Sequence, residues 1–170
     1  NNTGFFPNQN INLSEPQIMR GLVLGQVSFT PYKYFIDEKK LEIYDAVQIN
    51  ISETNQISFD YFIPEKKSYI FDELYEDLVI NYSRSDRSED YQTPSILYIC
   101  GGSSINNAYF QELVNWRHKQ GYIVTVVSTN ETGSSENNIN NYIENAYLNW
   151  ENPPEIVGLV GDVGGTYNID

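Results

Sequence analysis

One cysteine and one histidine are the residues that could carry thiol-based catalysis in this chain. Cys100 ends the apolar run SILYIC immediately before two glycines, and His118 lies near the far end of the helix predicted to follow. A nucleophilic cysteine needs a depressed pKa and a base within hydrogen-bond reach. The helix N-terminus would favour a thiolate by only about 0.3–1 kcal/mol. At 1.5 Å per residue, the helix places His118 roughly 20 Å away. We therefore interpret Cys100 as a buried core thiol and His118 as a solvated cation.

Asp162 follows the apolar run EIVGLVG and precedes two further glycines. In a parallel sheet, the carboxyl ends of the strands form the edge where ligands bind. Two interpretations stay open: Asp162 has a functional role at this edge, or it fixes its own turn through backbone N–H groups. The turns GGSS and GDVGG lack the glycine spacing of phosphate-binding loops. This argues against a nucleotide-binding module.

Charge and composition exclude several classes of partner. The chain has 170 residues, with 23 acidic and 10 basic side chains and a net charge of -13. Such a surface repels nucleic acid and anionic lipid. No apolar run approaches the ~20 residues of a membrane span, and the first residues lack the pattern of a signal peptide. A single cysteine gives no internal disulfide and no information on the redox compartment.

The first 80 residues predict a β-rich region that ends in a short helix. Residues 26–36 and 41–51 predict an antiparallel pair joined by the polar connection DEKK, and residues 56–63 predict a third strand ended by Pro64. We expect part of a β-sandwich. A helical stripe follows, with every third or fourth residue apolar: Phe71, Leu74, Tyr75, Leu78 and Val79.

Residues 81–94 contain almost no aliphatic side chain and predict an exposed linker at a domain boundary. Residues 95–170 then alternate strand, helix, strand, helix and strand, with strands at SILYIC, YIVTVVS and EIVGLVG. Ser104 is the expected N-cap of the first helix, and Gly121 is expected to follow its C-terminus. This order predicts a three-layer α/β half-domain with a parallel sheet. The overall class is α+β, and the incomplete sheet indicates a fragment of a longer protein.

The second half contains, in order, the helix end WRHKQGY, the strand VTVV, the helix INNYIENAY, the link WENPP and the strand end LVGD. In this order and spacing, these elements resemble the start of a gingipain-type cysteine peptidase, the C25 family. Independently, residues 14–51, from SEPQIMRG to VQINI, resemble the end of the propeptide of that family. The resemblance covers about residues 14–165, with both parts in the expected order.

The resemblance implies a secreted or cell-surface bacterial cysteine endopeptidase zymogen that cleaves proteins or peptides. It implies a caspase-like topology with the catalytic cysteine and histidine further along the chain, so neither Cys100 nor His118 belongs to the dyad and the fragment alone is inactive. Calcium, which such domains bind, makes Asp162 a candidate ligand. Arg84 and Arg87, in the linker, become candidate processing sites, with ordinary surface cations as the other interpretation. The alternative is a non-catalytic relative that serves in secretion or adhesion.

Overall fold

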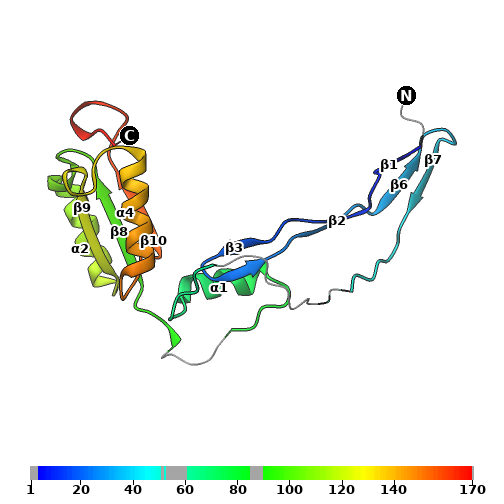
Figure 1. Cartoon of the computed structure of the whole chain (residues 1–170), viewed down its shortest axis with the longest axis horizontal. Helices are drawn as coiled ribbons and strands as arrows, with labels where there is room; N and C mark the ends of the chain where they lie inside the picture. Colours follow the sequence, from blue (N-terminus) through cyan, green and yellow to red (C-terminus); the bar gives the residue numbers. More distant parts are fainter. Residues whose placement is uncertain (1–3, 51, 53–60, 85–89, 170) are drawn as a thin grey trace. The chain divides into compact units, whose positions relative to one another are not determined.

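The computed structural model describes residues 4–50, 52, 61–84 and 90–169. The chain forms two compact units, Asn1–Pro64 and Glu65–Asp170 (Figure 1). The chain contains helices as well as antiparallel and parallel strands, and the C-terminal unit contains a parallel three-stranded sheet. These features confirm the α+β class. Each unit is described by itself below.

The N-terminal unit consists of short antiparallel strands. They pair in three small groups with the strand orders β1-β6-β7, β2-β5 and β3-β4. The turn between β3 and β4 holds Arg20 at φ 43° and Gly21 at φ 82°, the left-handed pair that suits a two-residue hairpin. The strands are β1 Phe5–Phe6, β2 Ile11–Leu13, β3 Gln17–Met19, β4 Leu22–Leu24, β5 Val27–Phe29, β6 Tyr32–Phe35 and β7 Lys40–Ile43.

The predicted hairpin across residues 37–40 is confirmed, because β6 pairs antiparallel with β7. Two predicted strands are shorter than expected. The run 26–36 divides into β5 and β6, and the run 41–51 is a strand only as far as Ile43. Residues 47 and 49 belong to no strand, because no partner strand pairs with this part of the run. Most of the predicted strand 56–63 lies outside the described residues, and residues 61–63 form none.

The predicted sandwich is not confirmed. A sandwich core needs alternate residues of two facing sheets to be buried. No residue of the N-terminal unit that the structure describes is buried, and large apolar side chains such as Leu13 and Ile43 are 69% and 67% exposed. Strands of two to four residues offer too few inward-facing positions to bury a core.

The C-terminal unit is a parallel sheet between helices. The strand order is β10-β8-β9, and all three strands run parallel. Its elements are α1 Tyr69–Leu78, β8 Ser95–Cys100, η2 Ser104–Asn106, α2 Ala108–Lys119, β9 Ile123–Ser128, α3 Thr129–Thr132, α4 Glu136–Asn149, β10 Ile156–Val160 and η3 Gly165–Tyr167. The predicted order of strands and helices from residue 95 onward is confirmed.

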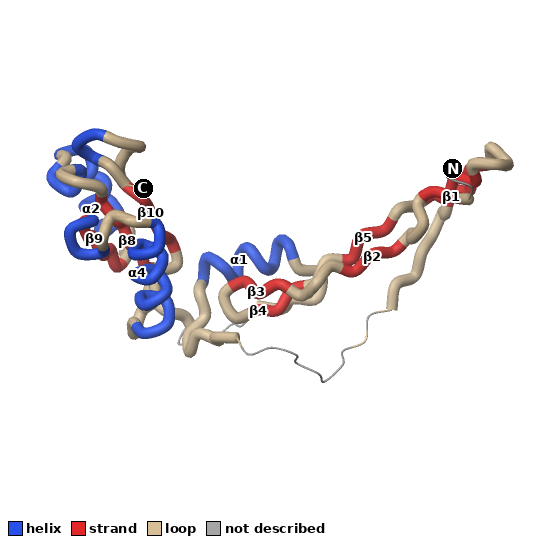
Figure 2. The backbone as a smooth tube through the Cα atoms, turned by 45° about the horizontal axis from the view of Figure 1, so that its top comes forward, coloured by secondary structure: helices blue, strands red, loops and turns tan. Residues whose placement is uncertain are grey.

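The central strand β8 explains the three layers. All six of its residues are buried, and successive side chains point to opposite faces. Tyr98 and its same-face neighbours pack with Phe110 of α2, while Leu97 and Ile99 pack with Ile139 of α4. Figures 1 and 2 show α2 and α4 on opposite faces of the sheet. A strand covered on both faces is the reason that SILYIC is apolar throughout.

The helix ends differ partly from prediction. Helix α2 begins at Ala108, not at Ser104, because the side chain of Asn107 accepts the N–H groups of Tyr109 and Phe110. Ser104 instead donates its hydroxyl hydrogen to the carbonyl of Val160 at 2.9 Å and so ties η2 to β10. Gly121 follows α2 at φ 92°, as predicted. Among the described residues, no helix combines the length and hydropathy required to cross a bilayer.

Candidate functional site

Two groups of residues in the C-terminal unit are candidates for function. The first is the carboxyl edge of the parallel sheet, where β8 and β10 end in glycines. A Cβ on Gly101 would lie 2.5 Å from the carbonyl oxygens of Tyr167 and Asn168, and one on Gly102 would lie 1.9 Å from that of Thr166. Gly102 also has a φ of 52°. These glycines are therefore explained by the close packing of residues 166–168 against the end of β8.

Asp162 lies in the loop that leaves β10 at this edge. Its carboxylate accepts the backbone N–H of Val163 at 2.8 Å, and its backbone bonds to Tyr167 and Ile169 at 3.0 and 3.1 Å. These contacts support the interpretation that the aspartate fixes its own turn. A hollow of about 240 Å³ lies beside it, lined mainly by polar and small residues: Ser104, Asn107, Phe110, Val160, Gly161, Asp162 and Tyr167.

Calcium binding at Asp162 requires more ligands than this loop supplies. Calcium takes six to eight oxygen ligands. Within the described residues, no three His, Cys, Asp or Glu side chains lie close enough together to hold a metal ion. Asp162 alone supplies too few ligands for a calcium site, and the calcium assignment stays a prediction.

Cys100 is buried, whereas His118 is exposed. Cys100 has no exposed surface and belongs to the core between the sheet and α2. Burial raises the pKa of its thiol and outweighs the opposing effect of the nearby Ser104 hydroxyl. His118 is exposed in the last turn of α2, whose first turn follows the carboxyl end of β8. The structure thus does not bring the two side chains together.

The second group surrounds helix α1, whose buried face differs from prediction. The buried residues are Asp72 and Tyr75, whereas Leu74 and Leu78 of the predicted stripe are 39% and 65% exposed. Asp72 is 2% exposed, and its carboxylate accepts hydrogen bonds from the hydroxyls of Tyr82 and Tyr91. The bond from Tyr91 is 2.5 Å long. A buried carboxylate is stable here because hydrogen bonds replace its hydration.

The hydrogen bonds to Asp72 contribute to a raised pKa in both tyrosines. The pKa of Tyr82 is raised mainly by burial and secondly by its hydrogen bond to Asp72. For Tyr91 the hydrogen bond to Asp72 is the main cause of a raised pKa. In both residues the neutral hydroxyl, which can donate to Asp72, is therefore the favoured form.

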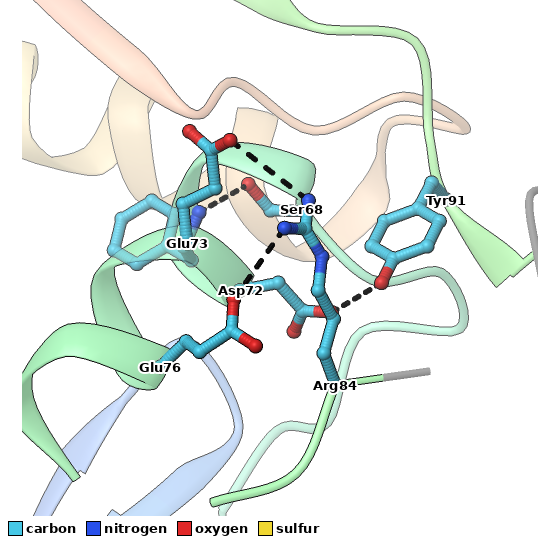
Figure 3. Close-up of polar contacts among 7 residues, drawn as sticks. Ser68, Asp72, Glu73, Glu76, Arg84 and Tyr91 are labelled. Atoms are coloured by element: carbon cyan, nitrogen blue, oxygen red, sulfur yellow. Dashed lines mark hydrogen bonds and ion pairs between the residues drawn. The ribbon is translucent and has the colours of Figure 1, made fainter. Parts of the chain in front are cut away.

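Arg84 is held by four residues of the same unit, which we call the Arg84 cage: Tyr69, Glu73, Glu76 and Tyr91. Its guanidinium lies 4.2 Å from the ring centre of Tyr69. It lies 3.6 Å from the carboxylate of Glu76 and 4.0 Å from that of Glu73. Hydrogen bonds with Tyr91 and Tyr69 raise its pKa. Figure 3 shows Arg84 between the two glutamates, with Tyr91 bonded to Asp72 beside it.

Some described residues of the predicted linker 81–94 pack against the rest of the C-terminal unit, and the linker itself stays a prediction. The Arg84 side chain is 24% exposed, and Gln92 is 4% exposed. Gln92 donates its side-chain N–H to the carbonyl of Pro153 at 2.9 Å. A polar composition does not by itself mean full solvation, because Arg84 and Gln92 have partners in α1 and near residue 153. Arg87 lies outside the described residues.

Sequence reasoning missed Asp72, Tyr82 and Tyr91. Two signals were available in the sequence. Asp72 lies between the apolar residues of the stripe in the α1 segment. Tyr82 and Tyr91 enclose residues 83–90, which consist only of Ser, Asp, Glu and Arg. Tyrosine combines a large apolar ring with a hydroxyl that finds a partner when buried.

Two family models match the chain and meet at this cluster. Propeptide_C25 matches residues 1–89, and Peptidase family C25 matches residues 89–169. The chain belongs to the C25 peptidase family. Residue 89 lies inside the predicted boundary 81–94, whereas the compact units divide at residues 64 and 65. Helix α1 therefore belongs to the propeptide by sequence and to the unit of the parallel sheet by structure.

Gingipains of Porphyromonas gingivalis are similar to almost the whole chain. Gingipain R1 is 25% identical over an alignment of 162 positions, which covers 93% of this chain and 16% of the relative. Gingipain R2 is 26% identical over an alignment of 171 positions, which covers 95% of this chain and 23% of the relative. The C25 chain thus spans less than a quarter of the length of these relatives. No solved structure matches it.

Proposed function

We propose that the chain is the junction between the inhibitory propeptide and the peptidase domain in the zymogen of a secreted, gingipain-like cysteine endopeptidase. The observation that carries this proposal is the pair of family matches, which occur in one chain, in this order, and meet at residue 89. The parallel sheet with helices on both faces lies on the peptidase side and supports a caspase-like topology. Secretion or display on the bacterial surface follows from the resemblance to gingipains.

The proposed chemistry is acyl transfer by residues outside the part of the protein described above. A cysteine thiolate attacks the scissile carbonyl carbon, and a histidine gives a proton to the leaving amine. Water then hydrolyses the acyl-enzyme and restores the thiol. The C-terminal unit supports this chemistry by forming the first strands of the sheet. Cys100, buried and with a raised pKa, takes no part in it.

Calcium remains part of the proposal as a structural cofactor. Asp162 would supply one carboxylate oxygen at the sheet edge, with the other ligands from residues further along the protein. Isothermal titration of the complete protein with calcium tests this assignment. Asp162→Asn should weaken the site at least about tenfold, and an unchanged affinity would assign Asp162 to its turn alone.

The decisive experiment uses the complete protein, expressed with all residues that follow this chain. A thiol-directed peptide probe should label a cysteine other than Cys100, and Cys100→Ala should retain full peptide hydrolysis. Sequencing the matured peptidase should place its new N-terminus within residues 85–95. Absence of thiol-dependent hydrolysis would support the non-catalytic alternative, and labelling of Cys100 with loss of activity in the alanine variant would refute the proposal.

A further inference from the structure

We propose that Arg84 connects helix α1 to the segment around Tyr91, and that the Arg84 cage protects the bond after Arg84 from arginine-specific cleavage in the folded chain. This inference deepens the proposed function, because it concerns the choice of processing site at the propeptide junction. It concerns Arg84 only, since Arg87 lies outside the described residues.

The contacts of Arg84 occupy the group that an arginine-specific peptidase must bind. Such enzymes select their substrate by inserting the arginine side chain into a specificity pocket that ends in a carboxylate. In this chain the same guanidinium already faces the Tyr69 ring at 4.2 Å and the Glu76 carboxylate at 3.6 Å. It cannot enter a second pocket while it remains in the cage. Cleavage after Arg84 therefore requires the cage to open first.

The cage is anchored on both sides of the family boundary. Tyr69, Glu73 and Glu76 belong to α1, on the propeptide side. Tyr91 lies on the peptidase side, and its neighbours form a short parallel bridge with Lys67: the N–H of Lys67 donates to Asp90 at 2.7 Å, and the N–H of Gln92 donates to Lys67 at 2.9 Å. Arg84 thus fastens the last helix of the propeptide to the first residues of the peptidase.

The rate of cleavage after Arg84 measures the fraction of molecules in which the Arg84 cage is open. When opening and closing are fast relative to cleavage, the rate is proportional to the open population. A synthetic peptide spanning residues 80–90 has the same sequence around the bond and no α1, so it reports the unprotected rate. The ratio of the two rates gives the protection that the fold supplies.

The test uses trypsin on the complete 170-residue chain in an Arg87→Gln background, so that cleavage after residue 87 does not precede the cut of interest. Mass spectrometry follows the initial rate of cleavage after Arg84. The opening variants are Glu73→Gln with Glu76→Gln, which removes both ion pairs, and Tyr69→Leu, which removes the aromatic face. Asp77→Asn is the matched control, because Asp77 is an exposed acid of the same helix.

We expect the folded chain to be cut after Arg84 at least about tenfold more slowly than the peptide. Each opening variant should be cut at least about threefold faster than the parent chain, and Asp77→Asn should not differ from it. Cleavage after Arg117 in α2 serves as the internal measure of folding, and its rate should stay constant in all variants. A folded chain cut as fast as the peptide, or variants with the Arg117 rate preserved and no gain at Arg84, would overturn the inference. Because the trypsin is added, these results do not depend on whether the complete protein is an active peptidase.

Discussion

Replacement of Asp72 by alanine should destabilise the C-terminal unit by about 2–3 kcal/mol. The carboxylate is 2% exposed and accepts two tyrosine hydroxyls. Hydrogen bonds to a charged group contribute about 1.5–3 kcal/mol each. Tyr82 and Tyr91 are half-buried, so water can replace part of the lost interaction, and the estimate stays below the sum of two full bonds. Asp72→Asn should cost about 1 kcal/mol, because an amide oxygen still accepts one hydroxyl.

Urea denaturation measures this change in the free energy of unfolding. Trp116 and Trp150 both lie in the C-terminal unit, so their fluorescence reports on the unfolding of the sheet and its helices. Far-UV circular dichroism, recorded on the same samples, reports whether α1 unfolds before the rest. The variant should shift the fluorescence transition or produce an earlier loss of helical signal.

Asp77→Ala is the control, because it removes an exposed acid from the same helix and should change stability by less than about 0.5 kcal/mol. If Asp72→Ala also changes stability by less than about 0.5 kcal/mol in both signals, the hydrogen bonds to Tyr82 and Tyr91 do not stabilise the unit. The role given to Asp72 would then be wrong.

Three further predictions concern pH, thiol reactivity and close packing. Above about pH 10, where an unfolded tyrosine loses its proton, folded Tyr82 and Tyr91 keep theirs because their pKa values are raised, so unfolding releases protons and stability falls as pH rises. Tyr82→Phe with Tyr91→Phe should flatten this alkaline loss of stability in urea titrations from pH 8 to 11, and an unchanged slope would contradict the assignment. Cys100 should react with a chromogenic disulfide reagent only in urea, since its side chain is fully buried; rapid reaction in buffer would show that the core thiol is accessible. Gly102→Ala should lower the melting temperature by several degrees, because its Cβ would lie 1.9 Å from the carbonyl oxygen of Thr166 and its φ is 52°; a melting temperature equal to that of the parent would exclude close packing of this turn.

The parallel half of the fold could be predicted because its local signals agree with its packing. The run SILYIC is apolar at every position, as required of a strand buried on both faces, and the helix from residue 136 carries its apolar stripe at regular spacing. Ile139 and Ala146 of that stripe are indeed buried against the sheet. The start of α2 was misplaced, because Ser104 and Asn107 are both good N-cap residues and the backbone selects Asn107. The short helices α3 and η3 were not predicted.

The β-rich half was predicted less well because strands depend on partners. Alternating apolar residues at 41–51 have strand propensity, yet the described structure pairs only Lys40–Ile43 with β6. A strand is stabilised by cross-strand neighbours, which a single sequence does not identify. The apolar side chains of these residues remain exposed within their own unit for the same reason.

The buried face of α1 shows why polar sites are the hardest to predict. The apolar spacing favoured Leu74 and Leu78, but burial of Asp72 gains two hydroxyl donors, from residues 10 and 19 positions later in the chain. Both donors, Tyr82 and Tyr91, lie inside the segment 81–94 that the sequence predicts to be solvated. Tyr91, which donates to Asp72, also belongs to the Arg84 cage. Helix α1 therefore contacts described residues on both sides of the family boundary at residue 89. Because Tyr91 contacts both Asp72 and Arg84, we expect any substitution that weakens the Asp72 contacts also to speed cleavage after Arg84.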